Sequence, residues 1–460
     1  MMDPLYTLAT LADAAGGTLL GGAPDTPVTG ISIDTRTLAP GDAFFAIKGV
    51  AMDGHRFLAD ALAKGASAAV VRDDPGEGAR IVVEGDVLAA MERVGLASRA
   101  RLASEATVVA VTGSVGKTGT KEMLRLAFGA AGPVHASAAS YNNHWGVPLT
   151  LARMPKDVAA AIFEIGMNHA GEITPLTKMV RPQIAIVTTV AAVHLEFFDS
   201  VEGIADAKAE IFCGLQEGGT AIIPADNPHT ARLKKAAEQY GHIVTFGAGE
   251  ADVQLLSYDE DTATAEAKVL GQTVRYRLGA PGRHVADNSL AVLAALHVAG
   301  RDVAKGAAAL HGFSAPKGRG RRLTLTVDGG EAVLIDEAYN ANPASMAAAI
   351  ASLGLTPATR KVALLGDMLE LGDTADALHR GLAALLIEAD ARIVHTVGPM
   401  MMHLRQALPP ERRGHHTQTA DEIASLVEVS AGDAVLVKGS NAVGLGQVVD
   451  ALSREGVKNA

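Results

Sequence analysis

A glycine-rich loop between an apolar strand and a helix constrains this chain more than any other feature. The β-branched run that ends at Val111 leads into T-G-S-V-G-K-T, and a helical pattern follows Lys117. Gly113 and Gly116 let backbone N–H groups converge, and the positive end of the helix dipole points at the same place. The loop therefore predicts a site for the phosphates of a nucleoside triphosphate in a parallel α/β domain.

Two side chains of this loop fit phosphate chemistry. Lys117 places a positive charge near the terminal phosphates, and the Thr118 hydroxyl can ligate a Mg²⁺ ion that bridges them. The match to the general pattern G-x-x-x-x-G-K-[ST] is imperfect, because Val111 occupies the first glycine position. Such loops occur in kinases, GTPases and ligases, so other residues must decide the reaction.

Alternating strands and helices on both sides of the loop predict three α/β domains. The length of 460 residues agrees with about 150 residues per domain. Apolar strand candidates at 160–166, 183–190, 219–226 and 242–247 alternate with helical segments, as in parallel βαβ units. The basic, glycine-containing stretch 313–322 is interpreted as a linker. We expect domains at 1–104, 105–313 and 314–460: a small mixed α/β unit, a central parallel-sheet domain and a Rossmann-like domain.

Composition excludes several classes of protein. The net charge of −11 and the 4% aromatic content argue against a nucleic-acid binder, which needs a basic face and stacking rings. The single cysteine, Cys213, cannot form an internal disulfide and fits a reducing compartment. Neither a signal peptide nor an apolar stretch of about 18 residues is found, so we expect a cytoplasmic protein without a membrane span.

Three more side chains are candidates for the same site. Glu164 and His194 each follow a predicted strand, and Lys208 lies in an alanine-rich helical segment. Ligands of open α/β folds bind at the carboxyl edge of the sheet, where Glu164 and His194 are expected. Taken singly, each has an ordinary explanation: a capping glutamate, a loop histidine and a surface lysine. Only their combination with the phosphate loop indicates a shared role.

Several motifs in order along the chain resemble the Mur ligase superfamily. They are S-Y-N-N-x-x-G-x-P (140–148), E-I-G-M-N-H-A-G-E-I (164–173), GRHVADN (282–288), IDEAYNANPASM (335–346), LLGDMLELG (364–372) and LVKGSNA (436–442). These enzymes use ATP to join an amino acid or peptide to a UDP-MurNAc-peptide. The combination is most similar to the branch that adds D-alanyl-D-alanine to UDP-MurNAc-tripeptide for peptidoglycan synthesis. The segment SIDTRTLAPGDAFFAIKG resembles the uridine-diphosphate-binding domain of that superfamily.

The resemblance implies a set of ATP contacts. Asn288 and His284 would lie near the adenine and phosphates, Asp336 near the ribose, and Arg319 or Arg321 near the γ-phosphate. The implied ATP-binding residues are Gly113, Ser114, Val115, Gly116, Lys117, Thr118, His284, Asn288, Arg319, Asp336, Tyr339 and Asn340.

The resemblance also implies metal, catalytic and substrate residues. Thr118 and Glu164 would hold one Mg²⁺, and His194 and Lys208 a second, with Lys208 carbamylated by CO₂. The implied catalytic residues are Lys117, Glu164, His194 and Lys208, and the implied substrate-binding residues are Thr35, Arg36, Asn142 and Asn143. The substrate carboxylate would form an acyl phosphate, which the amine of the dipeptide then attacks. A monomer whose last domain closes on ATP and binds the dipeptide is implied as well.

Two alternatives remain open at this point. The branch that adds the third amino acid carries D-N-P-R in its last domain, whereas the only Asp-Asn-Pro here is Asp226–Pro228, followed by His229 in the central domain. A noncatalytic nucleotide-binding relative is the second alternative. The joint presence of Lys117, Thr118, Glu164, His194 and Lys208 argues against it.

Overall fold

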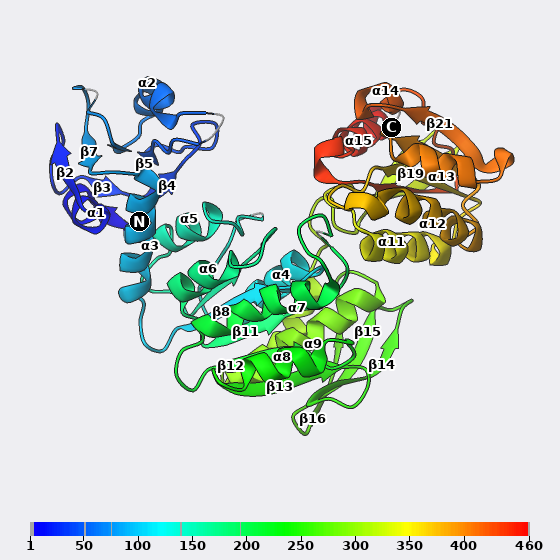
Figure 1. Cartoon of the computed structure of the whole chain (residues 1–460), viewed down its shortest axis with the longest axis horizontal. Helices are drawn as coiled ribbons and strands as arrows, with labels where there is room; N and C mark the ends of the chain where they lie inside the picture. Colours follow the sequence, from blue (N-terminus) through cyan, green and yellow to red (C-terminus); the bar gives the residue numbers. More distant parts are fainter. Residues whose placement is uncertain (1–3, 50–51, 75, 139, 194, 459–460) are drawn as a thin grey trace.

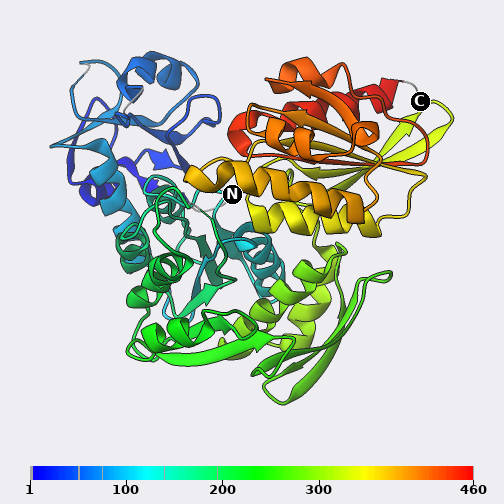
Figure 2. The same ribbon diagram turned by 45° about the vertical axis from the view of Figure 1, so that its right-hand side comes forward.

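Each of the three lobes is built around one large β-sheet. The computed structural model describes residues 4–49, 52–74, 76–138, 140–193 and 195–458, and His194 lies outside them. The central lobe carries the N-terminal lobe and the C-terminal lobe on one side (Figures 1 and 2). The predicted α/β fold class with three domains is confirmed. The expected boundaries at 104/105 and 313/314 fall in the connections before β8 and before β17.

The N-terminal sheet has five strands in the order β2-β7-β6-β5-β4, with only β2 antiparallel to its neighbour. Its strands are β2 (Gly17–Leu20), β4 (Gly30–Ser32), β5 (Asp42–Phe45), β6 (Ala68–Val71) and β7 (Arg80–Val83), and β1 (Tyr6–Thr7) pairs with β3 (Pro27–Val28) beside it. Its helices are α1 (Leu8–Ala15), η1 (Gly54–Phe57), α2 (Leu58–Ala63) and α3 (Val87–Ala100).

The central sheet has nine strands in the order β16-β15-β14-β13-β12-β11-β8-β10-β9. They are β8 (Thr107–Thr112), β9 (Val134–Ala136), β10 (Ala160–Glu164), β11 (Ile184–Val187), β12 (Thr220–Pro224), β13 (His242–Gly247), β14 (Val253–Asp259), β15 (Thr264–Val269) and β16 (Gln272–Arg277). From β9 to β14 all pairs are parallel, whereas β15 and β16 extend the sheet antiparallel. The carboxyl ends of β8, β10 and β11 therefore meet at one edge.

Helices cover both faces of the central sheet because strand side chains alternate between them. Val109 and Val111 pack toward α4 and α9, whereas Val108 and Ala110 pack toward the side of α5, α6 and α7. The helices are α4 (Lys117–Gly129), α5 (Gly146–Ala152), α6 (Ile173–Val180), α7 (Val201–Ala209), η2 (Glu210–Gly214), α8 (Thr230–Ala237), α9 (Arg283–Val298), α10 (Val303–Ala309) and η3 (Leu310–Gly312).

The C-terminal sheet has six strands in the order β17-β18-β22-β19-β20-β21, parallel except for β17. They are β17 (Arg321–Val327), β18 (Gly330–Glu337), β19 (Arg360–Gly366), β20 (Ile393–Val397), β21 (Arg413–Thr417) and β22 (Asp433–Lys438). The helices are α11 (Pro343–Leu355), η4 (Gly372–Thr374), α12 (Ala375–Glu388), α13 (Met401–Ala407), η5 (Pro410–Arg412), α14 (Ala420–Ala424), η6 (Asn441–Val443) and α15 (Gly446–Lys458). The linker prediction was two residues too long, because Arg321 and Arg322 pair with β18.

Arginine side chains join the N-terminal and central lobes. Arg99 on α3 donates from Nε to the Val180 carbonyl at 2.7 Å, and Arg153 donates from Nε to the Ile31 carbonyl at 2.6 Å. These bonds satisfy carbonyls that would otherwise be left without partners at the junction. No helix in the described part of the chain is long and apolar enough to cross a membrane.

Candidate active site

The phosphate loop is fastened to the neighbouring strand β11. Ser114 donates its backbone N–H to the Thr189 carbonyl at 2.9 Å and its hydroxyl to the Ala191 carbonyl at 3.0 Å. Gly113 has a φ of 148°, and a Cβ atom there would lie 1.9 Å from Thr188 Oγ1. The loop therefore requires glycine at this position, and its backbone N–H groups are held ready for an anion.

Lys117 begins α4 and faces the loop. Its Nζ donates to the Gly113 carbonyl at 2.6 Å. Desolvation lowers the pKa of Lys117 to about 8, with Glu164 opposing this shift and Arg319 adding to it. A phosphate bound at the loop would favour the charged form of this amine.

Glu164 brings a carboxylate to the side of the loop. It ends β10 opposite Val111 of β8 and is fully buried. Thr118 Oγ1 donates to Glu164 Oε2 at 2.9 Å, and Asn142 Nδ2 donates to Glu164 Oε1 at 2.8 Å. A carboxylate and a hydroxyl beside a phosphate site are the oxygen ligands that Mg²⁺ prefers, so these residues fit the predicted metal.

Lys208 lies in the last turn of α7 and is only 2% exposed. Its Nζ has neither a hydrogen-bond nor an ion-pair partner among the described residues. Desolvation, with repulsion from Lys117 as the second cause, holds the pKa of Lys208 far below its ordinary value. The structure thus places a buried amine with a strongly lowered pKa in electrostatic reach of the phosphate loop. His194, the other predicted ligand of the second metal, lies outside the described residues.

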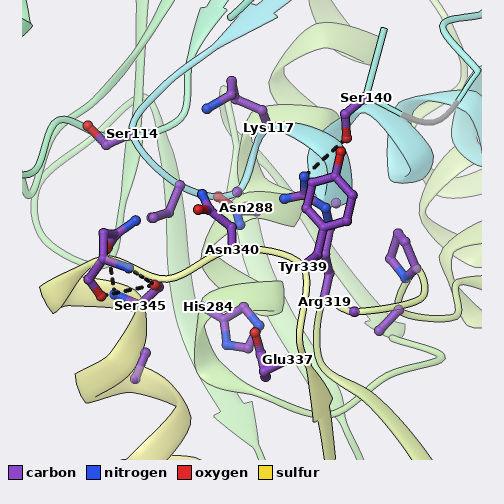
Figure 3. A pocket seen from close by; sticks show the side chains of 18 of the residues that line it. Ser114, Lys117, Ser140, His284, Asn288, Arg319, Glu337, Tyr339, Asn340 and Ser345 are labelled. Atoms are coloured by element: carbon purple, nitrogen blue, oxygen red, sulfur yellow. Dashed lines mark hydrogen bonds between the residues drawn. The ribbon is translucent and has the colours of Figure 1, made fainter. Parts of the chain in front are cut away.

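A cavity of about 630 Å³ opens between the central and C-terminal lobes beside this loop. Figure 3 shows Asn288 and Asn340 near one another below Lys117, with Arg319 and Tyr339 to the right and His284 beside Glu337. Among the predicted ATP-binding residues, the cavity is lined by Ser114, Val115, Gly116, Lys117, His284, Asn288, Arg319, Tyr339 and Asn340. Glu164 and Asn142 line it too, so two of the three predicted domains contribute to one site.

Arg319 is the linker arginine that faces this cavity. Its Nη2 donates to Ser140 Oγ at 3.1 Å, and its guanidinium lies 4.2 Å from the centroid of the Tyr339 ring. Arg321 is exposed on β17 and does not belong to the cavity lining. Cation–π stacking orients the Arg319 fork toward the phosphate loop, which favours Arg319 over Arg321 as the residue for the γ-phosphate.

Asp336 and Asn143 are bonded to local backbone rather than lining the cavity. The buried Asp336 accepts from the Gly318 N–H at 2.7 Å and the Ala338 N–H at 3.3 Å, and burial raises its pKa. Asp336 therefore holds the linker against β18, and its neighbour Glu337 faces the cavity instead. Asn143 accepts from the N–H groups of Trp145 and Gly146 at 3.1 and 3.0 Å and so starts α5.

Thr35 and Arg36 lie in the N-terminal lobe, apart from the cavity lining. The Arg36 side chain is 86% exposed and pairs with Asp34 at 2.6 Å. The backbone carbonyl of Thr35 accepts from Lys64 Nζ at 3.0 Å. The exposed guanidinium of Arg36 could contact a ligand on this lobe, but it does not belong to the lining of the nucleotide cavity.

Sequence reasoning missed an ion pair in the cavity wall. Lys438 is almost fully buried at the end of β22, and its Nζ donates to Glu337 Oε2 at 3.2 Å and to the Asn340 carbonyl at 2.9 Å. Desolvation lowers the pKa of Lys438, although Glu337 opposes this shift. The motif LVKGSNA was recognised, but a strand-end lysine carries no signal of which carboxylate it will face.

A second cavity of about 300 Å³ adjoins the first and shares Ser114, Lys117, Asn340, Asn342 and Asn441 with it. The C-terminal lobe supplies amide, hydroxyl, carboxylate and apolar groups to its wall. Its other lining residues are Val193, Ala341, Leu369, Glu370, Leu371, Ser440 and Ala442. A small, polar molecule held there would meet the first cavity at Lys117.

Comparisons with known proteins cover nearly the whole chain. Family models described as "Mur ligase family, catalytic domain", "Mur ligase middle domain" and "Mur ligase, glutamate ligase domain" match residues 27–103, 111–296 and 321–441. A UDP-N-acetylmuramoyl-tripeptide–D-alanyl-D-alanine ligase of Escherichia coli (strain K12) is 34% identical, over 98% of this chain and 99% of the relative. The solved MurF of Acinetobacter baumannii is 29% identical with a TM-score of 0.84, covering 98% of this chain and 99% of its own. The MurF ligase of Thermotoga maritima, solved in complex with ADP, is 26% identical with a TM-score of 0.75, covering 94% and 98%.

The pKa of Lys117 predicts a pH dependence of nucleotide binding. Below about pH 8 the free protein already carries the ammonium, whereas above it a bound phosphate must draw a proton onto Lys117. We expect the ADP dissociation constant to rise by up to about tenfold per pH unit above pH 8. Calorimetry from pH 6.5 to 9.5 measures this, and the Lys117→Arg variant should lose the dependence whatever its affinity. A wild-type affinity that stays constant up to pH 9.5 would contradict the assignment.

Proposed function

This chain belongs to the Mur ligase family, and from that premise we infer that it joins D-alanyl-D-alanine to UDP-N-acetylmuramoyl-tripeptide at the expense of ATP in peptidoglycan precursor synthesis. The observation that carries the inference is the Glu164–Thr118 pair beside the phosphate loop, in a cavity that both the central and C-terminal lobes line. Relatives of this activity align over nearly the full length of the chain.

Joining a carboxylate to an amine in water requires activation of the carboxylate. The terminal carboxylate of the tripeptide attacks the γ-phosphate of ATP, so that an acyl phosphate and ADP form. The dipeptide amine then attacks the acyl carbon, and phosphate leaves from the tetrahedral intermediate. Both steps bring anions together, so stabilisation of negative charge by Lys117 and Arg319 dominates the contribution of the protein.

We propose two metal sites. Thr118 and Glu164 would hold one Mg²⁺, and His194 and carbamylated Lys208 would hold a second. Mg²⁺ supplies Lewis-acid neutralisation of the phosphate oxygens. Asn142 bonds to the free oxygen of Glu164, so it orients this carboxylate and lies where the muramoyl-peptide end would approach.

Carbamylation gives Lys208 a physical role. A neutral amine adds to CO₂ by forming an N–C bond and releasing one proton, which yields an anionic carbamate with two oxygens. The lowered pKa of the buried Lys208 amine favours the neutral form that this reaction needs, and the positive charge of Lys117 would stabilise the anion that forms. An unmodified ammonium would instead repel a metal ion.

The three lobes then divide the substrates between them. We assign residues 1–104 to the uridine nucleotide, with Thr35 and Arg36 near the pyrophosphate, and residues 105–313 to ATP. Residues 314–460 would close on ATP and receive the dipeptide. The second cavity suits the dipeptide, because Leu369 and Leu371 can pack on its methyl groups, while amides can bind its ends and Lys117 lies at the junction with ATP.

A phosphate-release assay tests the activity. Purified protein with Mg²⁺, ATP and UDP-MurNAc-tripeptide should release phosphate only when D-Ala-D-Ala is added, because the acyl phosphate needs the amine to break down. The matched control supplies UDP-MurNAc-dipeptide and meso-diaminopimelate. Release in the control instead would identify a ligase for the third amino acid, and no release with any acceptor would indicate a noncatalytic relative.

The Lys208→Ala variant tests the carbamate. We expect a loss of at least about a hundredfold in kcat, because the missing anion stabilises charge in the transition state. Short carboxylates such as formate or acetate should restore part of the activity by occupying the space of the carbamate. Lys178→Ala, which changes a lysine on α6 outside the lining of both cavities, is the control. Full activity of Lys208→Ala, or inactivity that carboxylates do not relieve, would refute the carbamate.

The Leu369→Asp variant tests the dipeptide cavity. A carboxylate in this wall, in addition to that of Glu370, should raise KM for D-Ala-D-Ala by about tenfold through repulsion of the dipeptide carboxylate, while KM for ATP stays the same. Leu355→Asp, at an exposed leucine outside the cavity lining, is the matched control. Unchanged KM for the dipeptide in Leu369→Asp would place the dipeptide elsewhere.

A further inference from the structure

A second buried lysine lies on α4, one helical turn beyond the phosphate loop. The Lys121 side chain is 0% exposed, although lysine is almost never fully buried without a partner. Its Nζ donates to the Ser137 carbonyl at 2.8 Å and pairs with Glu122 Oε1 at 2.8 Å. Lys121 does not line either cavity and so does not touch nucleotide or metal. Its burial therefore calls for a role that acts through another residue.

Ser137 connects Lys121 to the metal-binding carboxylate. It directly follows β9 at the edge of the parallel sheet, where its N–H donates to the Ile162 carbonyl at 3.2 Å. Its hydroxyl accepts from the backbone N–H of Glu164 at 3.3 Å. Lys121 thus bonds to the same residue that contacts the backbone of Glu164.

The chain beyond Ser137 makes two more contacts to the site. Ser140 accepts from Arg319 of the linker, and Asn142 donates to Glu164 Oε1. The Asn142 carbonyl also accepts from the Gly166 N–H at 2.7 Å, so this segment is bonded on both sides of Glu164. We call Ser137, Ser140 and Asn142 the β9 segment. This segment contacts Glu164 and Arg319, but it is not adjacent in sequence to the phosphate loop.

We infer that Lys121 is a positioning residue that ties the β9 segment to the phosphate-loop helix and so holds Glu164 in place for the metal of the nucleotide. Thr118 and Lys121 lie on the same helix three residues apart, which puts them on one face of α4. Thr118 contacts the Glu164 side chain directly, and Lys121 fixes its backbone through Ser137. The two bonds together define the distance between the phosphate loop and the carboxylate. The inference rests on the proposed function for the identity of the ligand, a Mg²⁺–nucleotide complex.

Two measurements distinguish this positioning role from a general contribution to stability: the affinity for Mg²⁺ and the affinity for nucleotide in the absence of Mg²⁺. Without metal, nucleotide affinity depends on the loop backbone and Lys117, whereas the side-chain bonds of Lys121 lead to Ser137 and Glu122. With metal, nucleotide affinity depends also on Glu164. In Lys121→Met, which keeps the length of the side chain but removes its charge and donors, we expect Mg²⁺ to bind the protein–AMPPNP complex about tenfold more weakly. Affinity for AMPPNP in EDTA should stay within about twofold of the wild type.

Calorimetric titration of Mg²⁺ and AMPPNP on the full chain measures both quantities. Glu122→Gln is the matched control, because it removes the ion pair but leaves the Ser137 carbonyl available to Lys121, and its Mg²⁺ affinity should match the wild type. Ser137→Ala removes only the hydroxyl that accepts from Glu164, and it should weaken Mg²⁺ binding in the same way as Lys121→Met. The double variant should be no weaker than the stronger single variant, because both act on one connection.

Two results would overturn the inference. One is an unchanged Mg²⁺ affinity in Lys121→Met, and the other is an equal loss of affinity with and without Mg²⁺, which indicates general damage to the loop. If Lys121→Met does not fold, Ser137→Ala decides, since an unchanged Mg²⁺ affinity there also refutes the connection. Failure of the proposed function is distinguishable, because it appears as absent ligase turnover in a wild-type protein that still binds Mg²⁺ and AMPPNP.

Discussion

One hydrogen bond, from the Thr118 hydroxyl to the Glu164 carboxylate, links the phosphate loop to the rest of the site. It exists because β8 and β10 are parallel neighbours in a register that sets Glu164 opposite Val111. The phosphate loop follows β8 directly, so the sheet delivers a hydroxyl and a carboxylate to the same point. Moving β10 by one residue would turn the Glu164 side chain to the other face of the sheet and leave the loop without a carboxylate.

The remaining charges around this point are mostly positive, although the whole chain has a net charge of −11. Lys117, Arg319 and Lys438 surround the first cavity, and Lys208 lies within electrostatic reach of Lys117. Desolvation lowers the pKa of both Lys117 and Lys208, and repulsion from Arg319 adds to the shift at Lys117 as repulsion from Lys117 does at Lys208. The triphosphate and a carbamate would relieve this repulsion, which is why both fit the site electrostatically. Asp336 contributes indirectly by bonding the linker that carries Arg319.

Local patterns were sufficient to predict much of the fold. The strand–loop–helix around Gly113 follows from apolar patterning and glycine placement, and the structure confirms it. The antiparallel strands β14 to β16 were not predicted, because their side chains alternate between buried and exposed with breaks such as Leu256, an exposed leucine. Buried parallel strands have continuous apolar runs, and a search for such runs does not find strands of this alternating kind.

The sequence predicted the site residues that belong to motifs, but it did not predict those whose position depends on tertiary contacts. Lys117, Thr118 and Glu164 belong to recognisable motifs, and the structure brings them together. Nothing in the sequence distinguishes Arg319 from Arg321, and only the stacking on Tyr339 does so. Asn143 and Asp336 lie in motifs as well, yet their side chains bond to nearby backbone. Lys121 and Lys438 look like surface lysines in sequence, because burial depends on strands far away in the chain.

The most direct test of the central claim is a crystal structure with AMPPNP and Mn²⁺, grown in bicarbonate and measured for anomalous scattering of Mn²⁺. The account predicts one Mn²⁺ bound by Thr118 and Glu164 beside the phosphates. It predicts a second Mn²⁺ next to Lys208, with density for a carboxyl group on Nζ. A single ion away from Glu164, or an unmodified Lys208 amine without a metal near it, would contradict the account.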